Sequence, residues 1–212
     1  ARNQRYQKTF PGEMVHFDSK ILPHFEGENT KIFKREHLFV AIDDYSRNLF
    51  ADILPDKTQY SGALFLEETI RTFNFPMITA YSDNGGEFRG SQDHQVVKTC
   101  QQYGLSQQFT RPRTPRTNGK AERVIKTLLN EWLRKQRFNS REERKQSLYQ
   151  FVNYYNQKRC HQGINNLTPF EKLNSYFSPR GSYPQLEVST TLDKCTYCTP
   201  RSSSGFPQLN FD

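Results

Sequence analysis

The stretch Thr-Pro-Arg-Thr-Asn-Gly-Lys-Ala-Glu-Arg, residues 114–123, leads from a turn-rich loop into a helix and carries an acid, Glu122, at the junction. The apolar residues that follow recur at helical spacing and make one stripe: Val124, Ile125, Leu128, Leu129 and Trp132. At about 100° per residue, Glu122 falls on the edge of this stripe, so we expect it to face inward at the border of the core. The pattern predicts a helix from residue 121 to about 136, with Trp132 in the core.

Two further acids follow or lie within predicted core strands. Residues 14–22 form an apolar, β-prone run, which we interpret as a buried strand that carries Asp18. Residues 77–82 form a second short strand, and the turn residues after it place Asp83 at its carboxyl end, where ligand sites in α/β sheets lie. Because a buried charge is costly unless it is paired or bound to a metal, we group Asp18, Asp83 and Glu122 as one candidate site.

Three carboxylates without competing soft ligands favour a hard cation, because Mg²⁺ and Mn²⁺ prefer oxygen ligands. Two such ions roughly 3.5 to 4 Å apart can hold both the attacking and the leaving oxygen of an in-line displacement at phosphorus. Taken singly, each acid could instead be a helix cap, a turn former or a solvated surface group. Taken together, the three acids predict a metal-dependent phosphoryl-transfer site.

The distribution of charge points to a polyanionic partner. The chain of 212 residues has 30 basic and 22 acidic residues, a net charge of +8. Six basic residues surround the single acid Glu122 between residues 111 and 126: Arg111, Arg113, Arg116, Lys120, Arg123 and Lys126. A turn-rich basic loop beside a carboxylate site is what a DNA backbone requires, although a solvated loop is the alternative. The mean hydropathy of −0.88 and the lack of a run of ~20 apolar residues predict no membrane span.

Three motifs resemble the D,D-35-E signature of the retroviral-integrase catalytic core, in the version found in transposases of bacterial insertion sequences. They are His16-Phe17-Asp18, Ser82-Asp83-Asn84-Gly85 and the stretch 114–123. Residues 40–47, 155–161 and 167–171 strengthen the resemblance, which covers about residues 5 to 173. The chain departs from the family pattern in two places. The gap of 38 residues before Glu122 is slightly long, and Cys160 stands where the family often has proline.

The resemblance implies an RNase H-like α/β fold, a mixed five-stranded sheet flanked by helices with a C-terminal helical extension. From the residues, we expect strands at 14–22, 37–43, 48–54, 77–82 and 105–109, and helices at 62–73, 93–103, 121–136 and 141–158. We expect four segments: a lead-in at 1–13, the catalytic core at 14–138, the helical extension at 139–177 and a polar, flexible tail at 178–212. Since family members usually carry a DNA-reading helix-turn-helix segment ahead of the core, the chain looks like part of a longer protein.

The resemblance also implies the activity, metal-dependent DNA cleavage and strand transfer. Asp18, Asp83 and Glu122 would bind two Mg²⁺ or Mn²⁺ ions, with Asp18 bridging both, while Asn118, Lys120 and Lys126 would hold phosphates or terminal nucleotides. The expected partners are the element ends, the target duplex and further copies of the chain, at least as a dimer. The expected location is the bacterial cytoplasm, near the nucleoid. Two alternatives stay open: an RNase H-like nuclease that only hydrolyses, and a catalytically idle DNA-binding module derived from a transposase.

Other polar residues have simpler expected roles. Asp43 and Asp44 are predicted to shape a turn, and His16 to be hydrogen-bonded rather than metal-bound. Glu87 is predicted to be a surface acid rather than a group beside the site. The four cysteines are too few and too scattered for a disulfide scaffold, which indicates a reducing compartment. The Cys195/Cys198 pair is predicted to be free thiols rather than a zinc site.

Overall fold

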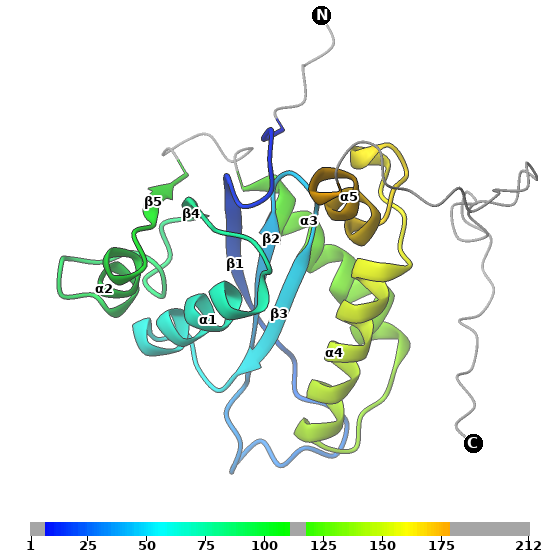
Figure 1. Cartoon of the computed structure of the whole chain (residues 1–212). Coiled ribbons are helices and arrows are strands. Elements are labelled where there is room, and N and C mark those ends of the chain that lie inside the picture. The colour runs from blue at the N-terminus through cyan, green and yellow to red at the C-terminus, as the bar shows by residue number, and fades with distance from the viewer. Residues whose placement is uncertain (1–6, 111–117, 179–212) are drawn as a thin grey trace, which may run out of the picture.

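The computed structural model describes residues 7–110 and 118–178. Within them, a mixed sheet has the strand order β3-β2-β1-β4-β5 (Figure 1). The strands are β1 (Val15–Ile21), β2 (His37–Asp43), β3 (Leu49–Leu54), β4 (Thr79–Ser82) and β5 (Ser106–Phe109). The first three pair antiparallel, whereas β4 runs parallel to both β1 and β5. The predicted mixed five-stranded sheet is confirmed.

Helices cover both faces of the sheet (Figure 1). They are α1 (Gln59–Thr72), α2 (Gln95–Gln102), α3 (Gly119–Thr127), α4 (Arg141–Gln157) and α5 (Pro169–Phe177), with a short 3₁₀ turn at Gln162–Ile164. Side-chain hydrogen bonds cap the N-termini of several of these helices. The Thr58 side chain accepts a hydrogen bond from the Ser61 N–H, and Ser140 does the same for Glu143. The Thr58 cap starts α1 three residues earlier than the apolar pattern predicts.

The alternation of side chains along each strand divides the core into two clusters. Val40 and Ile42 of β2 pack with α3 and α4, whereas Phe39 and Ala41 pack with α1 and α2. On β1, Phe17 joins the α1 side. The intervening residues of β1 therefore face α3, which orients that strand for the site described below.

The helix predicted from residue 121 to about 136 is interrupted. Helix α3 ends at Thr127, and a π-helical turn (Leu128–Trp132) and a 3₁₀ turn (Leu133–Lys135) follow. Leu128 and Trp132 are both fully buried, so the wider turn keeps the predicted stripe on the core.

The segment from residue 139 is packed onto the sheet rather than held away from it. Leu148, Phe151 and Tyr155 of α4 share one cluster with Leu49 and Val40 of the strands.

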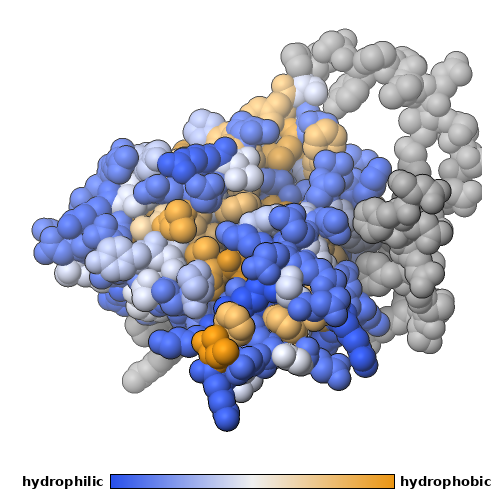
Figure 2. Space-filling model, turned by 90° about the horizontal axis from the view of Figure 1, so that it is seen from below, coloured by the Kyte–Doolittle hydropathy of each residue, from blue (hydrophilic) through white to orange (hydrophobic). Residues whose placement is uncertain are grey.

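The four-segment division stays a prediction, and the Cys195/Cys198 pair lies outside the described residues. No helix in the described ranges is long and apolar enough to cross a membrane. The face drawn in Figure 2 is mainly hydrophilic, with small apolar patches between polar side chains.

Candidate active site

Strand pairing brings Asp18 and Asp83 together. In the parallel β1–β4 pair, Phe17 lies opposite Ser82, the last residue of β4. The residues that follow them, Asp18 and Asp83, are both acids. The Ser19 N–H donates to Asp18 Oδ1 at 2.7 Å, and the Gly85 N–H donates to Asp83 Oδ1 at 2.9 Å. The second bond closes the turn that was predicted after β4.

Glu122 lies in the first turn of α3, which packs against β1 and β2. It was expected to face inward, but its side chain is exposed. Ala121, Val124 and Ile125 occupy the buried face of the helix instead, which leaves Glu122 on the flank. A negative charge in the first turn is favourable there because it complements the positive end of the helix dipole.

Electrostatic coupling shows that the three acids share one region. Burial, together with the carboxylates of Asp83, Glu122 and Glu87, raises the pKa of Asp18 to about 6, although a hydrogen bond from the Ser19 N–H acts to lower it. The acids at the end of β4 and in α3 thus lie close enough to Asp18 of β1 to influence its charge. Their catalytic role stays a prediction.

The chemistry of this donor set fits a hard divalent cation. All the donors are carboxylate oxygens, and their mutual repulsion is the kind that a cation relieves. Within the described part of the chain, however, no group of three or more His, Cys, Asp or Glu side chains already stands in position to hold a metal ion. The side chains are of the type that binds such a cation, but in the described residues they do not form a preorganised coordination site.

Glu87 is not the surface acid that the sequence predicts, since only 1% of it is exposed. Its Oε1 accepts a hydrogen bond from Ser19 Oγ at 2.7 Å and forms an ion pair with Lys57 Nζ at 3.0 Å. Among the described residues, its Oε2 has no partner. The neighbouring Gly85 makes room for this carboxylate, because a Cβ at that position would clash with it.

The predicted DNA contacts fall into three groups. Arg111, Arg113 and Arg116 lie outside the described residues. Arg123 and Lys126 are exposed on α3, the helix that carries Glu122. Asn118 and Lys120, in contrast, contact other parts of the protein.

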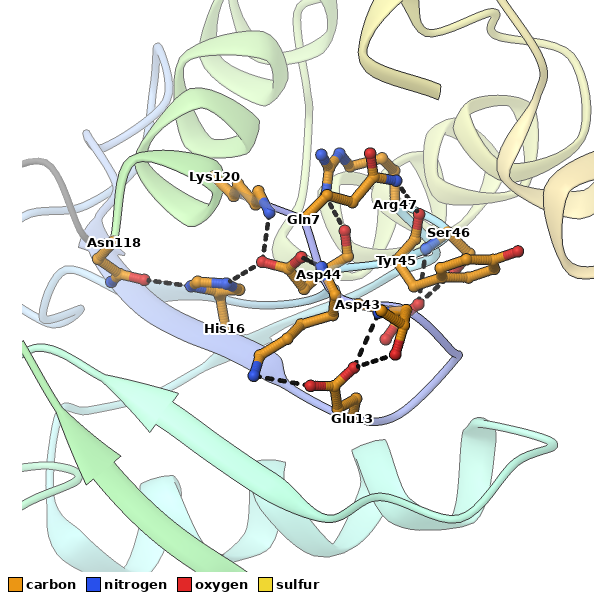
Figure 3. Close-up of polar contacts among 12 residues, drawn as sticks. Gln7, Glu13, His16, Asp43, Asp44, Tyr45, Ser46, Arg47, Asn118 and Lys120 are labelled. Carbon is orange, nitrogen blue, oxygen red and sulfur yellow. Dashed lines mark hydrogen bonds and ion pairs between the residues drawn. The ribbon is translucent and has the colours of Figure 1, made fainter. Parts of the chain in front are cut away.

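Those contacts form a network of four side chains, the Asp44 network: Asp44, His16, Asn118 and Lys120 (Figure 3). Asp44 Oδ2 lies 2.8 Å from His16 Nε2 and also contacts the Lys120 ammonium. On the other side of the imidazole, His16 Nδ1 lies 3.3 Å from Asn118 Oδ1. Both ring nitrogens of His16 therefore face a side-chain oxygen of another residue.

The expectation that His16 is hydrogen-bonded is therefore confirmed, and the turn role of Asp43 is confirmed as well. Asp43 accepts hydrogen bonds from the Gly12 N–H and from the N–H and hydroxyl of Ser46. Asp44 does more than shape the turn. Burial alone would raise its pKa, but the contacts with His16 and Lys120 hold that pKa well below its usual range.

Comparison with known proteins places the chain in a family. A model of the integrase core domain matches residues 9–115, and a second model of the same description matches residues 103–169. The transposase for insertion sequence element IS904 of Lactococcus lactis subsp. lactis (strain IL1403) is 28% identical over 178 residues, which cover 82% of this chain and 66% of that protein. The chain thus spans just under two thirds of that relative's length.

Two solved structures share the fold. The catalytic core domain of BIV integrase superposes with a TM-score of 0.57 at 20% identity, over 78% of this chain and 95% of that one. A simian T-cell lymphotropic virus intasome in complex with PP2A regulatory subunit B56 gamma superposes with a TM-score of 0.65 at 17% identity, over 90% of this chain and 64% of that one. The predicted RNase H-like fold is confirmed, and with a family model matched over half of its length, this chain belongs to the integrase core domain family.

Proposed function

We propose that this chain is the catalytic core of a transposase that cuts DNA at the ends of a mobile element and joins the freed 3′-hydroxyl to target DNA. The observation that supports the proposal is that Asp83 and Glu122 both act electrostatically on the largely buried Asp18 in an integrase-type fold. The similarity to a protein named as an insertion-sequence transposase supports the same reaction.

Under this proposal, the three acids hold two divalent ions, Mg²⁺ or Mn²⁺. Bound there, such ions supply charge stabilisation to the attacking and leaving oxygens of phosphoryl transfer. Asp18 and Asp83 each follow a paired residue of the parallel strands β1 and β4, and Glu122 lies in the first turn of α3, so these three elements would set the positions of the ligands. This fixed geometry is what converts a slow bimolecular displacement into an oriented one.

The basic residues keep the DNA backbone beside the acids. Arg123 and Lys126 are exposed within a turn of Glu122, where they would contact phosphates next to the reacting bond. Arg111, Arg113 and Arg116 complete the proposed basic surface. For Asn118 and Lys120, the contacts with His16 and Asp44 compete with a direct role on DNA.

The partners are accordingly the element ends, a target duplex and at least one further copy of the chain, since two ends must be joined in one event. A soluble assembly at the bacterial nucleoid in the cytoplasm is the setting that this reaction needs.

The test is a joining assay on the purified chain. Labelled duplexes carrying the DNA that flanks the gene for this chain are incubated with Mn²⁺ and a target plasmid, and products are resolved by length. Joined products in the wild type and none with Asp18→Asn or Asp83→Asn support the proposal. Cut but unjoined DNA would instead favour a hydrolytic nuclease, and DNA binding without either product an idle DNA-binding module.

A further inference from the structure

The carboxylate of Asp44 is fully buried, at 0% exposed, and has no part in the proposed chemistry. A charge in such a place is costly unless it is paired and hydrogen-bonded, and each oxygen of Asp44 is satisfied. Oδ1 accepts the Lys8 N–H at 2.7 Å, while Oδ2 contacts His16 and Lys120. Because the buried carboxylate has a partner for each oxygen, it fixes the positions of the segments that carry those partners.

The elements that it connects are those that carry the acids. His16 belongs to β1, and Lys120 belongs to the first turn of α3, whereas Asp44 itself follows directly after β2. The view in Figure 3 shows the Asp44 side chain between the imidazole and the ammonium, with Asn118 on the far side of the ring. One carboxylate therefore joins a strand to the start of a helix.

Asn118 extends this connection to Glu122. The Asn118 side chain is held at both ends, because its Nδ2 donates to the Phe17 carbonyl at 3.1 Å and its Oδ1 faces His16. Its own carbonyl accepts the Glu122 N–H at 3.2 Å, which is the first hydrogen bond of the helix. The backbone of Asn118 is therefore hydrogen-bonded directly to the backbone of Glu122.

The same strand also sets the position of Asp18. His16 and Asp18 are two residues apart on β1, so their side chains leave the same face of the sheet, toward α3. Through His16 and Asn118, the network thus fixes the first turn of α3 relative to the strand position that carries Asp18.

We propose that Asp44 is a positioning residue that, through His16, Asn118 and Lys120, sets the placement of Glu122 relative to Asp18. The effect on catalysis rests on the proposed function, whereas the effect on the helix does not. In this role Lys120 supports the site from within the protein, and its ammonium is not a main contact of the DNA backbone.

Asp43 is a matched control for Asp44. It is the adjacent residue, it is equally buried, and it also accepts three hydrogen bonds. Its hydrogen-bond partners are Gly12 and Ser46, and in the part of the chain that the structure describes neither of them belongs to α3. Asp43→Asn should therefore disturb the turn and lower the unfolding temperature about as much as Asp44→Asn, without releasing the helix.

The experiment compares the two variants in the full chain. For Asp44→Asn we expect hydrogen–deuterium exchange of the 118–127 peptide to accelerate at least ~10-fold. The joining rate at saturating DNA should fall ~10- to 100-fold, as when other supporting partners of metal ligands are removed, with DNA affinity within about threefold of wild type. For Asp43→Asn, both readouts should stay within about threefold. Because the network acts as a unit, adding Lys120→Met to Asp44→Asn should cost little more.

Unchanged exchange in folded Asp44→Asn, or equal acceleration in Asp43→Asn, would overturn the positioning role. The role would also be overturned if adding Lys120→Met to Asp44→Asn multiplied the loss of joining rate, because Lys120 would then act independently of Asp44. If Asp44→Asn does not fold, Asn118→Ala breaks the connection at the helix end and gives the same exchange readout. A wild-type chain that joins no DNA would count against the proposed function alone, because the exchange comparison still decides the role of Asp44.

Discussion

The charge of Asp18 is predicted to destabilise the fold when no cation is bound, and Asp18→Asn should relieve this. Burial first, and then the carboxylates of Asp83, Glu122 and Glu87, raise the pKa of Asp18 from an ordinary 3.8 to about 6. The folded state therefore binds this proton more tightly than the unfolded state, and stability falls as the pH rises from 3.8 through 6. The difference corresponds to roughly 3 kcal/mol. Solvent screening of the partly exposed side chain reduces this to about 2 kcal/mol.

The expected result is a variant that is more stable than the wild type. In EDTA at pH 7.5, Asp18→Asn should gain about 2 kcal/mol in urea unfolding, or about 4–8 °C in Tm for a chain of this size. At pH 4.5, where Asp18 is mostly protonated in the folded state, the gain should shrink to roughly a third. Saturating Mn²⁺ should reverse the order, because only the wild type keeps the full ligand set.

A matched control is Asp93→Asn, since the Asp93 side chain is 95% exposed and its removal should leave stability unchanged. The reasoning is refuted if Asp18→Asn is no more stable than the wild type at pH 7.5. It is equally refuted if the gain is the same at both pH values, because the stabilisation would then come from packing rather than from charge.

Three further outcomes follow from the packing and the charges. Trp132→Ala removes a fully buried side chain and should cost about 3–5 kcal/mol in urea unfolding. Gly62→Ala places a Cβ against the Glu87 carbonyl, so α1 must move, and limited proteolysis should cut the chain faster than in Gly86→Ala, where the space is open. Exposed Lys126→Ala should reduce the slope of log DNA affinity against log salt by about one, whereas Lys120→Ala should change it much less.

Local patterns were enough to predict most of the fold. The strand at 37–43 was predicted at its observed bounds, because an apolar run between turn residues has few other solutions. The interruption of the long helix could not be predicted in the same way. Leu128 and Trp132 are four residues apart, and that spacing suits both an α-helical and a π-helical turn.

The site was only partly predictable. Asp18 and Asp83 were recognisable from the strands that precede or contain them, but their relative placement depends on a β1–β4 register that links residues more than sixty positions apart. Glu87 was interpreted as a surface acid, although the structure buries it. Its burial depends on Ser19 and Lys57, which come from distant elements.

The register of β1 is the feature on which both the fold and the site depend. Because side chains alternate along a strand, Phe17 packs into the α1 side of the core while His16 and Asp18 face α3. A slip of one residue would place Asp18 among the aromatic rings that now surround Phe17 and would turn His16 away from Asp44. Pairing with β2 from Val15 to Ile21, and the Asp44 N–H bond to the Met14 carbonyl, prevent this slip. Asp44, which we propose positions Glu122, thus also helps to hold β1, the strand that carries Asp18, in register.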